Sequence, residues 1–171
     1  MKDLRNNPKL TRGLRNNNPG NLRASGIKWK GAAGIDSANF VVFSSLDYGI
    51  RAMLIDLASK YKRGLNTITK ILTVYAPPSE NNTPAYIDFV SKMTGIAPNE
   101  DIKPIPANLA KIALAMIYVE NGKNAANYIT PEDVLNGMRL VSPESAQVAN
   151  SGKIFPIILG IGIIGLILLN S

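Results

Sequence analysis

The chain has 171 residues and a net charge of +7, and it contains neither cysteine nor histidine. This composition excludes disulfides, thiol nucleophiles, cysteine/histidine zinc sites and the histidine-dependent serine and cysteine triads. We therefore expect no metal or other cofactor, and an enzyme of this composition would rely on carboxylate acid/base chemistry.

The positive charge is concentrated in the first third of the chain. Residues 1–63 hold twelve lysines and arginines against four acidic residues, whereas residues 64–171 hold seven against eight. A basic surface suits a polyanion such as anionic lipid, nucleic acid or an acidic cell-wall polymer, although modestly basic surfaces are common without any such partner.

The first segment, residues 1–11, has no apolar periodicity and predicts a flexible basic arm. The next, RGLRNNNPGN at 12–21, predicts a tight turn, because asparagine and glycine tolerate left-handed backbone conformations. The amides of Asn18 and Asn21 could bind the hydroxyl and acetamido groups of a sugar, or the turn could serve no ligand.

Residues 22–43 have a short, β-like pattern. Residues 27–29 alternate, a glycine-rich turn follows at 31–34, and an apolar run covers 39–43, which predicts a hairpin or a sheet of two to three strands. Trp29 lies between two lysines and could stack on a sugar face or simply cover the core.

Two helices are predicted next. Residues 45–63 have an amphipathic pattern that ends at Gly64, and residues 67–75 form a shorter helix for which Asn66 is a plausible N-cap. Tyr75 lies at the end of this second helix, just before a loop rich in proline.

The loop at 76–82 carries Glu80 and precedes a further helix. Thr83 followed by Pro84 predicts an N-cap and first helical residue, and Tyr86 starts the apolar face of a helix that ends at Gly95. The positive dipole at this helix N-terminus favours the ionised form of Glu80.

The clearest helix is predicted at 107–122 and carries a carboxylate on its apolar face. Apolar residues recur at helical spacing at Leu109, Ile112, Ala113, Met116 and Ile117, and the next position in this series is Glu120. Burial and the negative end of the helix dipole would both raise the pKa of Glu120, as a general acid for glycosidic-bond cleavage requires. Alternatively, Glu120 turns outward into solvent at a frayed last turn.

The remaining segments are a capped helix start at Thr130, a polar linker at 142–153 and an apolar stretch at 154–169. The apolar stretch has sixteen residues without a charge, and a helix of that length is about 24 Å long, slightly short of the bilayer core. We predict a C-terminal transmembrane anchor rather than a buried core helix.

Several motifs occur in order: RGLRNNNPGNLRASGIKWKG, NFVVF, SSLDYGIRAMLIDLASKY, YAPPSENNTPAYIDFV and YVENG. They resemble phage and prophage proteins with an Arg-Asn-Asn-Asn-Pro-Gly-Asn motif, among them virion structural proteins of membrane-containing marine phages of the corticovirus kind. The resemblance covers roughly residues 12–140.

Parts of the chain also resemble the lysozyme-like bacterial glucosaminidases, which share an Asn-Asn turn, a Trp-x-Gly hairpin and a Thr-x-x-Tyr helix start. In those enzymes the catalytic glutamate closes a helix just before the Asn-Asn turn, whereas here the helix ending in Glu120 comes late in the chain. Circular permutation of such a domain would explain this order, and so would loss of activity.

These observations predict an α+β, mainly helical fold: a lysozyme-like domain at 12–141, with a small β-hairpin and a transmembrane helix. The resemblance implies a virion-associated, membrane-anchored muramidase, glucosaminidase or lytic transglycosylase that degrades peptidoglycan in phage entry or exit. Glu120 would be the acid and Glu80 a base or charge stabiliser. The expected substrate-binding residues are Asn18, Asn21, Trp29, Tyr75, Thr83 and Tyr86.

The alternative is a structural protein without enzymatic activity, whose basic first third binds capsid, lipid headgroups or DNA. The expected partners are thus peptidoglycan, the lipid bilayer and other virion membrane or capsid proteins, with nucleic acid less favoured. We expect the chain in the virion membrane or the host cell membrane, held by its single C-terminal span. A small pore-forming lysis protein is a weaker interpretation, because a large folded domain with one short span suits an anchor better.

Overall fold

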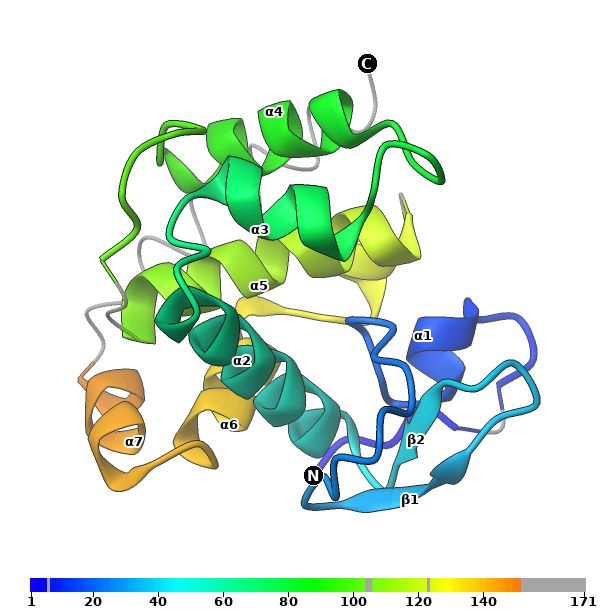
Figure 1. Cartoon of the computed structure of the whole chain (residues 1–171). Helices are drawn as coiled ribbons and strands as arrows, with labels where there is room; N and C mark the ends of the chain where they lie inside the picture. The colour runs from blue at the N-terminus through cyan, green and yellow to red at the C-terminus, as the bar shows by residue number, and fades with distance from the viewer. Residues whose placement is uncertain (6, 104–105, 123, 152–171) are drawn as a thin grey trace.

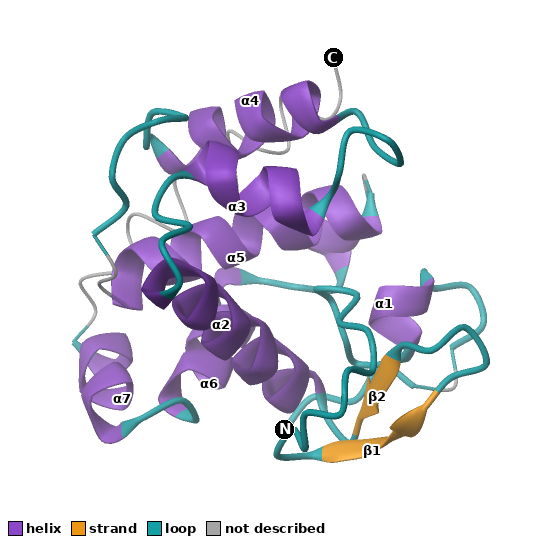
Figure 2. Ribbon diagram, in the orientation of Figure 1, coloured by secondary structure: helices purple, strands orange, loops and turns teal. Residues whose placement is uncertain are grey.

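The computed structural model describes residues 1–5, 7–103, 106–122 and 124–151, and this part of the chain is mostly helical with one two-stranded antiparallel sheet (Figures 1 and 2). The elements are α1 (Arg12–Arg15), β1 (Ala32–Ile35), β2 (Val41–Phe43), α2 (Leu46–Lys62), α3 (Ile68–Tyr75), α4 (Thr83–Thr94), α5 (Pro106–Asn121), the 3₁₀ helix η1 (Ala125–Asn127), α6 (Pro131–Arg139) and α7 (Pro143–Asn150).

Helix α5 runs through the centre of the helical layer and contacts α2, α4 and α6 (Figure 1). Its residues from Ile112 to Tyr118 are all buried, so the helix is enclosed on more sides than the single apolar face that its spacing predicts. Small side chains such as Ala113 and Ala115 allow neighbouring helices to approach closely. Gly122 ends the helix with a φ of 75°, as the Asn-Gly stop predicts.

Helix α2 packs against α6 on one side and, on another, against the asparagine-rich turn, which is the turn predicted at residues 12–21. A Cβ atom at Gly49 would lie 1.7 Å from the carbonyl oxygen of Asn17, and one at Gly137 would lie 2.5 Å from Cγ2 of Ile50. Both positions therefore require glycine, because any side chain would separate the packed backbones. Gly64 follows the helix with a φ of 88°, in agreement with the predicted end.

The sheet differs from its prediction. Strand β1 overlaps the segment predicted to be a turn at 31–34, and residues 27–29, predicted to be extended, belong to no strand. The turn comes earlier, at Gly31, whose φ is 80° and where a Cβ would collide with the ring of Tyr48. The strands pair Gly34 with Val42 and Ile35 with Val41, and an irregularity follows at Ala32.

Helix caps confirm one prediction and shift two others by a residue. Thr130 and Asp133 form the capping box of α6. Thr67, rather than Asn66, caps α3, and Asn82, rather than Thr83, caps α4. Both shifts have the same cause: consecutive polar residues at a helix start offer competing oxygen acceptors, and spacing alone does not select between them.

The first residues, predicted to be an arm, lie against the helical layer. Lys2 forms an ion pair with Asp133 at 2.9 Å, and its carbonyl accepts a hydrogen bond from the backbone N–H of Leu46. The N–H of Leu4 donates to the side chain of Asn17, and Leu10 is buried in the main core. These contacts provide the order that this short segment could not provide by itself.

The segment expected to be a linker contains helix α7. Ser142 is its N-cap and Pro143 occupies the first turn, which is the same signal that correctly marks Thr130 and Pro131. The helix packs against α6 and α5, and Ala149 is buried in the core. The small polar residues that suggest a linker thus form an amphipathic helix with a narrow apolar face.

The predicted fold class is wrong. Instead of a lysozyme-like α+β domain with a transmembrane helix, the structure shows mostly helices and one two-stranded sheet. Within the described ranges no helix is long and apolar enough to cross a membrane. The predicted span at 154–169 lies outside the described residues. The lysozyme-like prediction rested on short turn and cap motifs, which specify local geometry and not the assembly of the fold.

Candidate functional site

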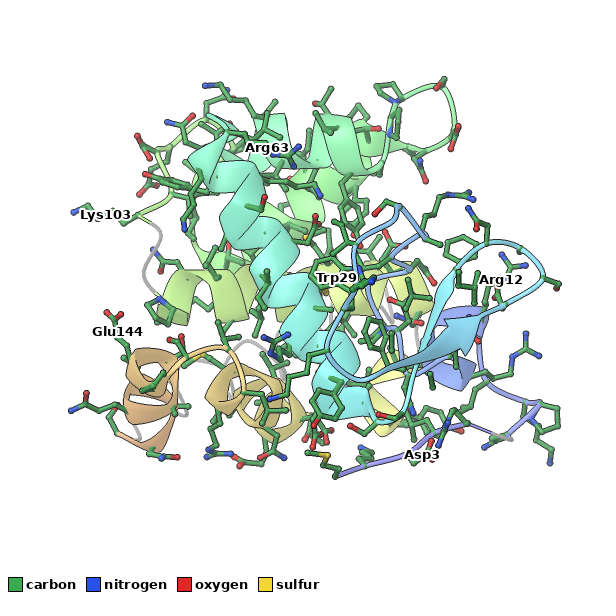
Figure 3. All side chains as sticks on the ribbon, turned by 60° about the horizontal axis from the view of Figure 1, so that its bottom comes forward. Asp3, Arg12, Trp29, Arg63, Lys103 and Glu144 are labelled. Atoms are coloured by element: carbon green, nitrogen blue, oxygen red, sulfur yellow. The ribbon has the colours of Figure 1, made fainter. Side chains whose placement is uncertain are left out.

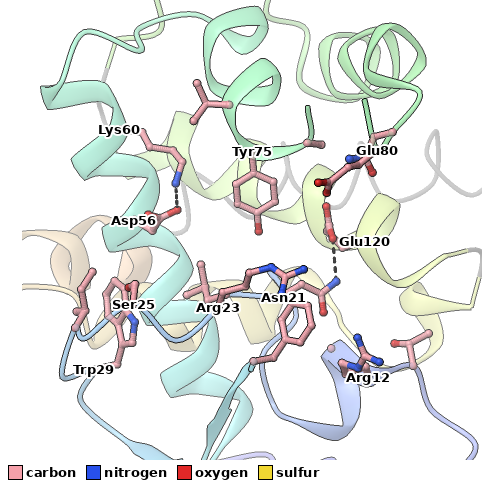
Figure 4. A pocket seen from close by; sticks show the side chains of 18 residues that line it. Arg12, Asn21, Arg23, Ser25, Trp29, Asp56, Lys60, Tyr75, Glu80 and Glu120 are labelled. Atoms are coloured by element: carbon pink, nitrogen blue, oxygen red, sulfur yellow. Dashed lines mark hydrogen bonds and ion pairs between the residues drawn. The ribbon is translucent and has the colours of Figure 1, made fainter. Parts of the chain in front are cut away.

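An open cavity of about 480 Å³ lies where the asparagine-rich turn, the loop before β1, α2, the end of α3, the loop before α4 and the end of α5 meet (Figure 4). Five predicted site residues line it: Asn21, Trp29, Tyr75, Glu80 and Glu120. These residues span about a hundred positions of sequence, so the tertiary fold brings them together.

Glu120, one residue before the end of α5, receives two hydrogen bonds. Nδ2 of Asn21 donates to Oε2 at 2.8 Å, and the hydroxyl of Tyr86 donates to Oε1 at 3.0 Å. Burial raises the pKa of the Glu120 carboxyl above its ordinary value of 4.5, while the two hydrogen bonds act in the opposite direction. The effect of burial on the pKa is larger than that of the hydrogen bonds, so the pKa is raised, as the sequence predicts. The side chain faces the cavity instead of turning into solvent.

The end of α5 is fixed to the asparagine-rich turn by Asn121. Its side-chain amide donates to the carbonyls of Pro19 and Ile117, and its Oδ1 accepts a hydrogen bond from Thr11 at 2.8 Å. In the turn, Asn21 has a left-handed conformation with a φ of 49°. The buried Asn121 therefore holds Glu120 and Asn21 in register.

Two tyrosines border Glu120, the partly buried Tyr75 and the buried Tyr86. The hydroxyl of Tyr75 donates to the carbonyl of Gly20, whereas that of Tyr86 donates to Glu120. Burial raises the pKa of each well above 10, and the charge of Glu120 raises it further. Both hydroxyls consequently stay protonated at neutral pH and act as hydrogen-bond donors.

Two other carboxylates line the cavity. Glu80 is exposed on the loop before α4, and Figure 4 shows its side chain extending toward Glu120. Asp56 lies on α2, on the far side of Tyr75 in the same view, and forms an ion pair with Lys60. The charge of Asp56 is thus neutralised locally, while Glu80 is accessible from solvent.

Three predicted substrate-binding residues do not line the cavity. Asn18 is 1% exposed and its side chain bonds the backbone of Leu22 and Val41. Thr83 is 2% exposed and donates to the carbonyl of Ala76, which closes the loop that carries Glu80. Tyr86 does not line the cavity either, and its hydroxyl donates a hydrogen bond to Glu120.

Sequence reasoning missed the cations of the cavity wall. Arg12, Arg23 and Lys60 all line it, together with the ring of Phe40. The spacing of Asp56 and Lys60, four residues apart on one helix, is a signal that could have found their ion pair. No comparable signal exists for the arginines, because their neighbourhood depends on the hairpin. No group of three acidic residues within the described ranges could hold a metal ion.

Comparison with known proteins gives one informative match. No family profile matches the sequence. Protein P5 of Pseudoalteromonas phage PM2 is 40% identical over 126 residues, which cover 68% of this chain and 75% of that protein. The match confirms the predicted relation to phage proteins of the corticovirus kind. The chain belongs to the phage protein family that includes Protein P5 of Pseudoalteromonas phage PM2.

Proposed function

We propose that this chain is a virion-associated phage enzyme that cleaves the β-1,4 glycosidic bonds of peptidoglycan. The observation that carries the proposal is Glu120, a partly buried carboxyl with a raised pKa that faces an open, polar cavity. A carboxyl group whose pKa is raised holds its proton to higher pH, which is what the general acid of glycosidic cleavage needs. A cavity of about 480 Å³ has the size of a typical ligand site.

In the first step, Glu120 donates its proton to the oxygen that links two sugars while the bond from the anomeric carbon to that oxygen breaks. The hydrogen bonds from Asn21 and Tyr86 strengthen as the carboxylate forms, because an ionised acceptor binds donors more tightly. They therefore stabilise the product of proton transfer. Trp29 and Asn21 offer a ring face and an amide for binding the sugars on either side.

The second step requires a nucleophile at the anomeric carbon. Glu80, exposed on the opposite loop, would accept a proton from an attacking water or stabilise the positive charge on the sugar ring. If Glu80 has neither role, a hydroxyl of the sugar itself attacks, the Glu120 carboxylate accepts its proton, and the reaction is an intramolecular transglycosylation.

The test uses the full chain on purified peptidoglycan and measures the loss of turbidity. We expect the wild type to clear the suspension, Glu120→Gln to lose activity by at least about a hundredfold, and Glu80→Gln to retain part of it. Glu144→Gln is the matched control, because Glu144 is an exposed acid distant from Arg12 and Trp29 in Figure 3. A folded wild type that leaves the suspension unchanged would refute the proposal.

The second candidate is a structural role in the virion, favoured by the basic first third of the chain. Arg12, Arg23 and Lys28 lie in this part, which would bind capsid, lipid headgroups or DNA. Salt-sensitive binding to DNA or to anionic vesicles, without release of glycan from peptidoglycan, would favour this role.

A further inference from the structure

Two arginines of the cavity wall share one aromatic ring. The guanidinium carbon of Arg12 lies 5.0 Å from the centroid of the Phe40 ring, and that of Arg23 lies 4.6 Å from it. All three residues line the cavity that contains Glu120, and Figure 4 shows both guanidinium groups on the side of Asn21. Contact with a ring limits the motion of a guanidinium group and leaves its N–H edge available.

Acidic side chains in the described part of the chain neutralise little of the positive charge of Arg12 and Arg23. Arg23 has no acidic partner among the described residues, and Arg12 is 3.7 Å from Asp36. The carboxylate of Asp36 already accepts hydrogen bonds from Asn16 and from the backbone of Ala38 and Phe40. Across the described ranges, no ion pair joins either arginine to Glu80 or Glu120.

We propose that Arg23, assisted by Arg12, binds a carboxylate carried by the glycan in this cavity and selects acidic over neutral polysaccharides. This inference rests on the proposed function, since it assigns the substrate class of the same site. A planar guanidinium with a free edge matches the two oxygens of a carboxylate, whereas a lysine would offer one point charge. Peptidoglycan carries free carboxylates on its peptide substituents, and chitin carries none.

The experiment measures binding of the full chain with Glu120→Gln, so that cleavage does not change the ligand. The ligands are purified peptidoglycan and the same material after amidation of its carboxyl groups. The variants, made in this background, are Arg23→Gln and Arg23→Lys. Arg63→Gln is the matched control, because Arg63 is an exposed arginine that lies well away from Arg12 in Figure 3.

We expect Arg23→Gln to weaken binding to native peptidoglycan about tenfold and to leave binding to the amidated form unchanged. Arg23→Lys should bind native material with intermediate affinity, and Arg63→Gln should match its parent on both ligands. Equal affinities of Arg23→Gln and its parent, or equal losses on both ligands, would overturn the inference. So would a parent that binds neither ligand, or one that binds both forms equally.

The same preparation separates this inference from the proposed function. The chain with Glu120 intact is incubated with native peptidoglycan, and release of soluble glycan is measured. Selective binding without release would refute the enzyme and retain the carboxylate site. Release by the wild type together with unselective binding would retain the enzyme and refute the carboxylate site.

Discussion

Glu120 is held in a balance between burial, which favours its neutral form, and two hydrogen bonds, which favour its charge. In the proposed reaction, this balance would let one group be an acid before bond cleavage and a stabilised carboxylate after it. The contribution of Tyr86 is distinct from that of Asn21, because Tyr86 is buried and does not line the cavity. Its removal therefore changes the acid without changing the cavity wall.

We predict that Tyr86→Phe raises the pKa of Glu120, since one hydrogen bond to the charged form is lost. The measurement is a carbon NMR titration of labelled glutamate side chains, and the alkaline limit of activity should move to higher pH with the pKa. Tyr118→Phe is the control, because the hydroxyl of Tyr118 bonds the carbonyl of Ile129. A Glu120 pKa that is unchanged or lower in Tyr86→Phe would contradict this assignment.

We also predict that Glu120→Gln stabilises the fold at neutral pH. The pKa of Glu120 is higher in the folded state than the ordinary value of 4.5, so the stability it contributes is present below about pH 4.5 and is lost as pH rises through the folded pKa. The free energy of unfolding of Glu120→Gln should therefore exceed that of wild type at pH 7 and approach it at pH 4. Urea unfolding measures both, with Glu144→Gln as control. A variant less stable than wild type at pH 7 would argue against the burial penalty.

At the scale of elements, the site depends on how α2, β2 and the first residues of the chain hold the asparagine-rich turn. Gly49 allows α2 to contact the carbonyl of Asn17, and Asn17 in turn binds Asp3 and the carbonyl of Phe43. The turn is thus fixed by a helix, a strand and the first residues of the chain. The position of Asn21 beside Glu120 thus depends on this packing together with the hydrogen bond from Asn121 to the carbonyl of Pro19.

Gly49→Ala should lower the free energy of unfolding by about 2 kcal/mol or more, because the added methyl group overlaps the carbonyl of Asn17. The loss should occur although alanine is the better helix former. Gly34→Ala, on an exposed strand with no atom within 4 Å of the new Cβ, should change stability by less than about 0.5 kcal/mol. Chemical denaturation measures the free energy of unfolding of both variants. Equal losses would contradict the close approach of Gly49 to the carbonyl of Asn17.

Thr130→Ala should lower the free energy of unfolding by about 1 kcal/mol, because the hydroxyl oxygen of Thr130 caps α6 by accepting a hydrogen bond from the backbone N–H of Asp133. The backbone N–H of Thr130 donates in return to the Asp133 carboxylate. Thr73→Ala is the matched change in the exposed face of α3 and should cost less than about 0.5 kcal/mol. Thermal unfolding of both variants measures the difference. A cost at position 73 as large as that at position 130 would contradict the capping role.

For the whole molecule, the sequence predicts the positions of helices better than it predicts how the helices pack together. The spacing along α5 correctly places Glu120 at the end of an apolar face, because that pattern depends on neighbouring turns of one helix. Its hydrogen bond from Asn21, 99 residues earlier in the chain, depends on tertiary packing, which the spacing along one helix does not reveal. The sequence prediction misses β1 because a glycine-rich segment has a weak strand signal. It misses α7 because the small polar residues of this segment outweigh the helix-start signal at Ser142 and Pro143.

The candidate site follows the same division. Asn21, Trp29 and Tyr75 were predicted from chemistry typical of sugar binding, and they line the cavity. Asn18 has the same chemistry, but its side-chain amide bonds the backbone carbonyls of Leu22 and of Val41 in β2, which no pattern of residue types reveals. The roles of all these residues in binding remain predictions. The contacts of Arg12 and Arg23 with Phe40 depend on the tertiary fold, so the sequence does not predict them.

The most direct test of the account is mass analysis of soluble glycan released from purified peptidoglycan by the full chain, with Glu120→Gln beside it. The account predicts disaccharide-containing fragments from the wild type and none above background from the variant. A new reducing end would indicate hydrolysis, and a 1,6-anhydro end would indicate transglycosylation. Equal release by the two proteins, or none by a folded wild type, would contradict Glu120 as the acid of a peptidoglycan-cleaving enzyme.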